Sequence, residues 1–244
     1  MGVAVRAFLF VLLVAAAAPA SARPITMNER IADISLHQQH LHTIGDRYAE
    51  YRQRVEQRLR PYFEQAHMPY PPNQLVLVAI KDQKVLQVYA VASGSPIKLV
   101  RTYPILAASG VPGPKLRERD KQVPEGVYGI EKLNPNSAFH LALRVAYPNA
   151  FDIEQAKIEG RTDLGTDIMI HGSDRSVGCL AMGNEAIEDL FILGADVGAP
   201  AIKLIITPVD FRKTHSLPPD TRLYPWSSEL YAHIKRDLAV LPEP

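Results

Sequence analysis

From residue 74 onward, short runs of branched and aromatic residues alternate with polar, Gly- and Pro-containing turns, a pattern typical of a sheet protein. The clearest pair of strands covers 74–80 and 85–91, with a charged turn at 81–84 between them. Further strands are predicted at 101–106, 126–130, 139–145, 167–171 and 201–206. Many short strands favour a sandwich or barrel-like sheet, so the predicted fold class is mainly β with helices (α+β).

Helical periodicity occurs before, within and after this series of strands. Within residues 23–72, apolar side chains recur every three or four positions, which predicts a helical N-terminal extension packed on the main domain or docked on a partner. Those side chains are Tyr48, Tyr51, Val55, Leu59 and Tyr62. Asn184 is predicted to cap a helix over 185–193 that ends at Gly194. A last helix, capped by Ser227 or Ser228, is predicted in the Pro-rich segment 213–244.

The first 22 residues have the pattern of a secretory signal peptide. Arg6 precedes a twelve-residue apolar run, Ala7–Ala18, and Ala20-Ser21-Ala22 is an A-x-A cleavage signal. Twelve residues are fewer than the roughly 20 that span a bilayer. We therefore expect export with cleavage after Ala22 and no stable membrane span after processing, with an uncleaved anchor as the alternative.

The net charge and the cysteine content exclude several classes of function. With 27 Lys+Arg against 26 Asp+Glu, the chain is not a strongly basic nucleic-acid binder. Cys179 is the single cysteine, so the sequence offers neither an internal disulfide nor a multi-cysteine zinc site. His37, His40 and His42 lack neighbouring ligands at metal spacing, and no metal is predicted. A lone cysteine in an exported protein is either buried and inert or a reactive thiol.

The segment 168–182 combines groups that suit nucleophilic catalysis. A predicted strand ends at His171, and a small polar loop leads to Gly178 and Cys179. A cysteine is mostly protonated at neutral pH, and a neighbouring imidazole can take its proton. The N–H groups of Gly178 and Cys179 could hold an oxyanion, and the Gly172 carbonyl is a candidate to orient His171. On residue types alone, a structural cysteine and histidine remain an alternative.

Several ordered motifs resemble the YkuD-type L,D-transpeptidase catalytic domain family. The segment from His171-Gly172 to Ser176-Val-Gly-Cys179 resembles the family signature, and 122–128 resembles its Pro-x-Gly-x-Tyr turn. Within that family, the sequence more closely resembles the YafK-like branch, whose motifs are matched at 108–110, 113–116, 133–137 and 147–150. The resemblance implies a β-sandwich-like catalytic domain at 73–212. Two departures stand out from the broader family, whose second histidine and following arginine are here Val177 and Ala181.

Site residues follow from the resemblance at matching positions. It implies that Cys179 is the nucleophile and His171 the general base. The predicted oxyanion or acyl pocket consists of Gly178, Ser176 and Gly172. Lys115, Tyr128 and Ser173 are predicted to contact substrate, with Lys115 replacing the missing arginine or standing as a solvated turn lysine. The resemblance implies no metal or organic cofactor.

The implied substrate is the peptidoglycan stem peptide, attacked at its diaminopimelate carbonyl to form a Cys acyl-enzyme in the periplasm. Transfer to an amine would make the protein a transpeptidase. Transfer to water would make it an amidase that cuts the diaminopimelate–lysine link to a lysine-ended envelope lipoprotein. A non-catalytic wall-binding module is the third alternative, and the His171–Cys179 pair argues against it.

Overall fold

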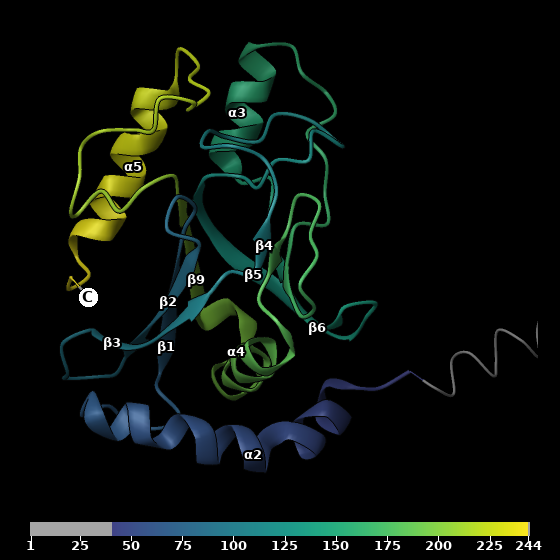
Figure 1. The fold of residues 1–244 in the computed structure, drawn as a ribbon, viewed down its shortest axis with the longest axis vertical. Coiled ribbons are helices and arrows are strands. Elements are labelled where there is room, and N and C mark those ends of the chain that lie inside the picture. Colours follow the sequence, from purple (N-terminus) through teal and green to yellow (C-terminus); the bar gives the residue numbers. More distant parts are fainter. Residues whose placement is uncertain (1–40, 244) are drawn as a thin grey trace, which may run out of the picture. The chain divides into compact units, whose positions relative to one another are not determined.

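The computed structural model describes residues 41–243, in which nine strands form one strongly curled sheet (Figure 1). The strand order is β3-β2-β1-β9-β5-β6-β7-β8-β4. β1 pairs in parallel with β9, β7 pairs in parallel with β8, and all other neighbours are antiparallel. The strands are β1 (Gln74–Ile80), β2 (Val85–Val91), β3 (Lys98–Pro104), β4 (Ala107–Ala108), β5 (Gly126–Ser137), β6 (His140–Val145), β7 (Met169–His171), β8 (Leu180–Ala181) and β9 (Ile202–Thr207). The mixed fold of sheet and helices confirms the predicted class.

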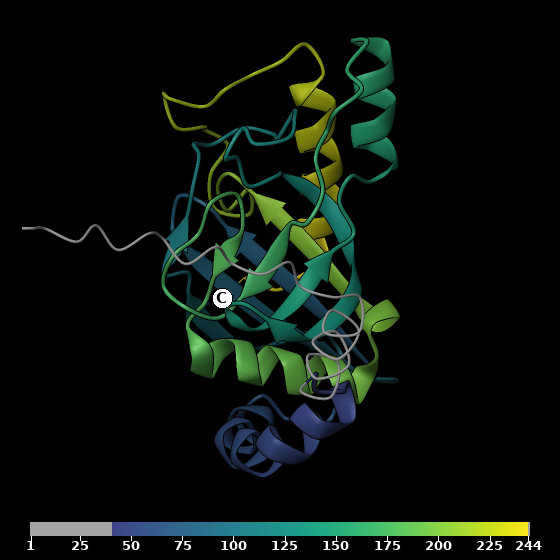
Figure 2. The ribbon, with the colours of Figure 1, turned by 90° about the vertical axis from the view of Figure 1, so that its right-hand side faces the viewer.

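Both faces of the sheet are covered, because β1 sends alternate side chains into two separate cores. Leu75, Leu77 and Ala79 join the core that contains helices α2 (Ile44–Gln65) and α4 (Asn184–Val197). Val76, Val78 and Ile80 join the core under helix α5 (Ser227–Ala239). A strand buried on both faces reads as a continuous apolar run, as 74–80 does. In Figure 2, α4 lies along the lower edge of the sheet with α2 beneath it, and α3 (Ala150–Ile158) and α5 lie at the opposite end.

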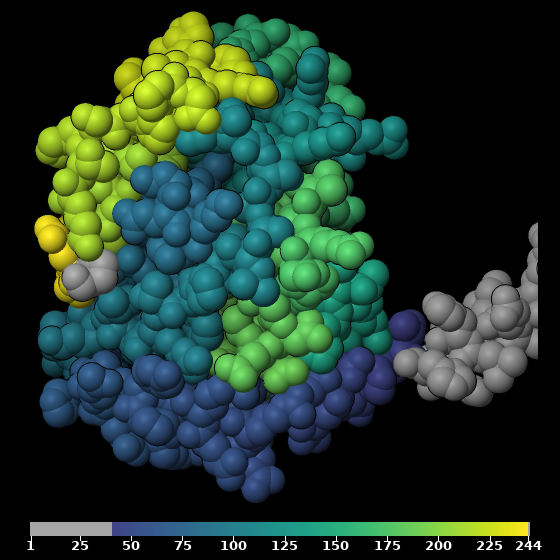
Figure 3. Space-filling model, in the orientation of Figure 1, coloured from purple at the N-terminus to yellow at the C-terminus, as the bar shows by residue number. Residues whose placement is uncertain are grey.

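The N-terminal helix is an integral layer of the domain. It begins with a capping box between Thr43 and Asp46, and its buried face consists of Tyr51, Val55, Leu59 and Phe63. The prediction of Tyr62 on that face was wrong, because Tyr62 is 38% exposed and Phe63 takes its place. Figure 3 shows the helix covering one end of the molecule. Residues 23–40, with His37 and His40, lie outside the described residues, as does the predicted signal peptide.

Ion pairs to a buried carboxylate fasten this layer. Asp189 on α4 is fully buried, accepts a hydrogen bond from Arg58 Nε at 2.8 Å, and pairs with Arg101 at 3.2 Å. Tyr103 donates its hydroxyl to the same carboxylate at 2.7 Å. The helix, the edge strand β3 and α4 therefore share one hydrogen-bonded charge.

Three predicted helix boundaries were wrong. α4 does not end at Gly194 but continues to Val197, and Gly194 packs so closely that a Cβ there would lie 3.0 Å from the Leu133 side chain. Its N-cap is Gly183, not Asn184, whose side chain instead accepts the Ser173 N–H at 3.0 Å. In α5 the N-cap is Trp226, and the Ser227 hydroxyl accepts the Tyr224 N–H. η1 (Ala199–Ala201) is a short 3-10 turn before β9.

Candidate active site

His171 is the last residue of β7, and its imidazole is held by the next peptide. Its Nδ1 lies 2.6 Å from the Gly172 carbonyl oxygen, so Nδ1 carries the proton and Nε2 keeps a free lone pair. The side chain is 2% exposed. Burial lowers the pKa of His171 below its ordinary value, and the Gly172 carbonyl opposes that shift. The imidazole is therefore neutral at neutral pH and available as a base. The Gly172 carbonyl is the orienting acceptor predicted for it.

Cys179 lies directly before β8, beside the same strand. In the parallel pair, Ile170 is opposite Leu180 and His171 is opposite Ala181. Cys179 precedes this paired segment by one residue, so the pairing of β7 with β8 brings it beside the strand that ends at His171. The half-buried thiol donates to the Asp167 carbonyl at 3.6 Å. Within residues 41–243 no hydrogen bond joins Sγ to the imidazole.

The Cys179 thiol is not an activated thiolate in this arrangement. Burial raises the pKa of Cys179, and the nearby Asp167 carboxylate adds to this effect. A backbone hydrogen bond at Met169 and the Lys115 ammonium oppose it. The pair therefore starts as a neutral thiol and a neutral imidazole, which suits general-base proton removal rather than a preformed ion pair.

Two serine hydroxyls hold the backbone around Cys179. Ser176 Oγ accepts the Cys179 N–H at 3.0 Å and donates to the Cys179 carbonyl at 2.7 Å. Ser109 Oγ, from a distant segment, accepts the Gly178 N–H at 2.6 Å and donates to the Lys121 carbonyl at 2.7 Å. Gly178 has a φ of 87°, which favours glycine. Both N–H groups predicted for an oxyanion are therefore already donated to hydroxyls.

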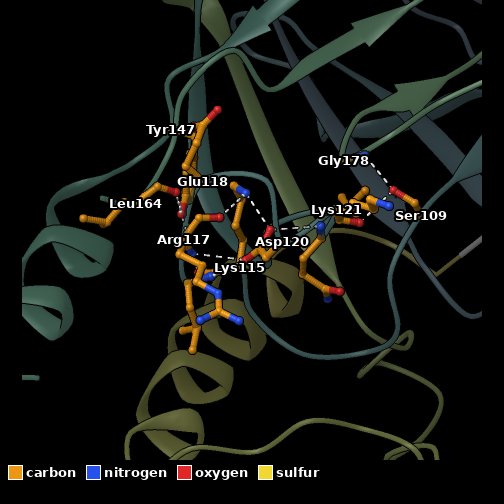
Figure 4. A network of polar contacts seen from close by, with 12 residues as sticks. Ser109, Lys115, Arg117, Glu118, Asp120, Lys121, Tyr147, Leu164 and Gly178 are labelled. Carbon is orange, nitrogen blue, oxygen red and sulfur yellow. Dashed lines mark hydrogen bonds and ion pairs between the residues drawn. The ribbon is translucent and has the colours of Figure 1, made fainter. Parts of the chain in front are cut away.

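Ser109 is a site residue that sequence reasoning missed. It belongs to one of the motifs that resemble the YafK-like branch, but its partner Gly178 is 69 positions away in the chain. Figure 4 shows its hydroxyl beside Gly178 and the Lys121 backbone. The segment between Ser109 and Lys121 is thereby tied to the loop that carries Cys179.

The three residues predicted to contact substrate lie in different surroundings. The Lys115 side chain is buried, and its ammonium lies 2.6 Å from Asp120 and 2.7 Å from the Arg117 carbonyl (Figure 4). It is thus not the solvated turn lysine weighed as the alternative. Tyr128 is buried in β5, where its hydroxyl donates to the Glu125 carbonyl at 3.0 Å. Ser173 is part of the loop after β7, at a φ of 67°. Of the three, Ser173 directly follows the His171-Gly172 pair.

Residues 41–243 contain no group of three or more His, Cys, Asp or Glu side chains that could hold a metal ion. The backbone N–H of His42 donates to the Asn136 side chain at 2.8 Å. Across the same residues, each helix is too short or too polar to cross a bilayer.

A comparison with known protein families identifies the class of protein to which this fold belongs. Residues 71–202, more than half of the chain, match the L,D-transpeptidase catalytic domain (YkuD). The chain therefore belongs to this family and carries an L,D-transpeptidase-type catalytic domain.

Individual relatives extend the comparison. The chain is 37% identical over 139 residues to "Putative L,D-transpeptidase YafK" of Escherichia coli K12, an alignment that covers 55% of this chain and 53% of that protein. The chain thus aligns with about half the length of that curated relative.

Among solved structures, it is similar to the helical cell shape determining protein Pgp2 of Campylobacter jejuni, with 26% identity and a TM-score of 0.44 over 55% of this chain and 48% of that one. It is also similar to Bdellovibrio bacteriovorus Bd1075, with 22% identity and a TM-score of 0.42 over 70% and 56% of the two chains.

Proposed function

We propose that the protein is an exported cysteine enzyme of peptidoglycan remodelling, with Cys179 as nucleophile and His171 as general base. The observation that carries the proposal is the pairing of β7, which ends at His171, with β8, which Cys179 directly precedes. The Gly172 carbonyl fixes the imidazole with Nε2 free. A non-catalytic wall-binding module would have no use for an oriented imidazole beside a solitary thiol.

The proposed first half-reaction forms an acyl-enzyme. His171 Nε2 takes the thiol proton as Cys179 Sγ bonds to the diaminopimelate carbonyl carbon of the stem peptide. The resulting tetrahedral intermediate collapses, the carbon–nitrogen bond to the leaving group breaks, and the imidazolium donates its proton to the departing amine. The product is a thioester on Cys179 and a neutral imidazole.

The second half-reaction transfers the acyl group. An amine or a water attacks the thioester carbonyl carbon and loses its proton to His171, and the Sγ–carbon bond breaks as the thiol is re-formed. An amine acceptor gives transpeptidation. Water gives hydrolysis, and with a lysine-ended lipoprotein as the leaving group the enzyme is an amidase. Both outcomes use the same two side chains.

The neighbouring hydroxyls bear on how the oxyanion is stabilised. The N–H groups of Cys179 and Gly178 are donated to Ser176 and Ser109. An oxyanion that used them would have to replace those hydroxyls as acceptor. We therefore propose that a small shift of Ser176 or Ser109 accompanies substrate binding, and that the predicted acyl pocket of Gly178, Ser176 and Gly172 forms in that state.

Mass spectrometry of two digests tests the proposal. Purified protein is incubated with tetrapeptide muropeptides, or with muropeptides that carry a lysine-linked lipoprotein fragment. Loss of D-alanine with new dimers supports transpeptidation, and release of the lipoprotein fragment with a free tripeptide supports the amidase. Cys179→Ala is expected to abolish either product while the circular dichroism spectrum stays that of the wild type. Full activity of that variant would contradict the mechanism.

A further inference from the structure

Phe139 is an exposed aromatic residue whose ring covers the imidazole of His171. It belongs to the tight turn between β5 and β6, where Ser137 pairs with His140. The side chain is 46% exposed, so it is not part of the core. The Phe139 and His171 rings are stacked, with centroids 4.6 Å apart and planes inclined by 29°.

The turn that presents Phe139 is fixed against the strand end. The Phe139 N–H donates to the Ser137 hydroxyl at 3.1 Å. His140 has a φ of 77°, and its Nε2 lies 2.9 Å from Glu188 on α4. A Cβ on Gly172 would lie 2.5 Å from the Phe139 carbonyl oxygen. The backbone of the turn and that of the His171-Gly172 pair are therefore in direct contact beside the stacked rings.

We infer that Phe139 is a positioning residue for His171: its ring fixes the plane of the imidazole and keeps water from one of its faces. The Gly172 carbonyl already restrains the ring through Nδ1, and the stack supplies a second restraint perpendicular to that bond. The imidazole they restrain is 2% exposed, although it lies at the end of a strand. The catalytic value of this positioning rests on the proposed function of His171, but the contact itself does not.

Two opposite electrostatic effects meet at such a contact. Excluding water disfavours the imidazolium, whereas a phenyl face favours a cation. Burial is the dominant influence on His171, and its pKa is lowered. The other charged and titratable groups around β7 are largely paired with each other: His140 pairs with Glu188, and Arg144 pairs with Asp167. Asp174 is exposed, and burial keeps the Cys179 thiol protonated by raising its pKa. Removing the Phe139 ring should therefore act on His171 mainly by admitting water.

Imidazole titration followed by NMR tests the inference without substrate. The variants are Phe139→Ala, Phe139→Tyr, which keeps the stacked ring, and Ile153→Ala, a matched control on α3 with a side chain 53% exposed. The His171 resonance is assigned by its loss in His171→Asn. We expect the pKa of His171 to rise toward 6.5 in the alanine variant and to stay at the wild-type value in the other two.

Turnover supplies the second readout. In Phe139→Ala, kcat should fall at least about tenfold with a smaller change in KM, because a misoriented base costs orders of magnitude in rate. Phe139→Tyr should restore kcat to within about twofold. An unchanged or lower pKa of His171 in folded Phe139→Ala would overturn the inference. If that pKa rises while no variant, wild type included, turns over muropeptides, the positioning role stands and the proposed function fails.

Discussion

The reactivity of Cys179 toward an alkylating agent should rise steeply with pH, because burial of the thiol outweighs the opposing effect of the Lys115 ammonium. Burial raises the pKa of Cys179 above the ordinary value of 9.0. At pH 7 the thiolate is then less than about 1% of the molecules, and it increases tenfold for each pH unit until the pKa is reached. Alkylation at pH 8.5 should accordingly be about 100-fold faster than at pH 6.5, since only the thiolate reacts.

The assay is simple because Cys179 is the only cysteine of the chain. Intact-protein mass spectrometry counts a single iodoacetamide adduct over time at pH 6.5, 7.5 and 8.5. The same protein unfolded in urea supplies the matched control, and at each pH its thiol should react faster than the native one. His171→Ala should keep the steep profile, because the neutral imidazole does not create the thiolate, yet it should lose turnover of the muropeptide substrate.

A preformed thiolate–imidazolium pair would give the opposite result. The rate of alkylation would level off below about pH 8, since the thiolate would already be present there. His171→Ala would then slow alkylation at pH 6.5. Either observation would refute the neutral-pair interpretation of His171 and Cys179.

Two further predictions concern stability. Burial raises the pKa of Asp152 from 3.8 to about 6, so the stability that its protonated form contributes below pH 3.8 is lost as the pH rises through 6. As the pH rises from 4 to 7.5, the unfolding free energy of Asp152→Asn, measured in urea, should therefore increase by up to about 3 kcal/mol relative to that of the wild type. The exposed control Asp163→Asn should show no such increase. Arg58→Ala removes one partner of buried Asp189 and should cost about 2 kcal/mol, whereas exposed Arg52→Ala should change the unfolding free energy by less than about 0.5 kcal/mol. An equal loss in the two arginine variants would contradict the role of the buried carboxylate.

Local patterns predicted the local structure well where neighbours in sequence determine it. The strands at 74–80 and 85–91 have exactly the bounds of β1 and β2, because a charged turn separates two apolar runs. α3 was missed, since its nine residues show almost no apolar periodicity, although Asn149 and Asp152 form a capping box there. The predicted end of α4 is wrong because Gly194 does not stop the helix: its small size serves contact with Leu133.

In the candidate site too, features set by one sequence segment could be predicted, whereas features that depend on distant segments could not. His171, Gly172, Ser176 and Cys179 lie within nine residues, so their motif was visible and the orienting role of Gly172 could be inferred. The charge states of His171 and Cys179 could not be predicted from this segment, because burial determines them and burial depends on the whole fold. The surroundings of Lys115 could not be predicted either, because its ion pair with Asp120 forms only in the folded segment.

The contribution of Ser109 shows why such contacts matter for the chemistry. A single hydroxyl accepts the Gly178 N–H and donates to the Lys121 carbonyl, so the backbone of the cysteine loop depends on a segment far from it in sequence. The proposed acid–base chemistry uses His171 and Cys179, but stabilising an oxyanion needs free N–H donors, and those of Gly178 and Cys179 are already bound. Oxyanion stabilisation therefore depends on what displaces the serine hydroxyls. A substitution of Ser109 is accordingly expected to change the rate of acyl transfer to an amine and to water alike.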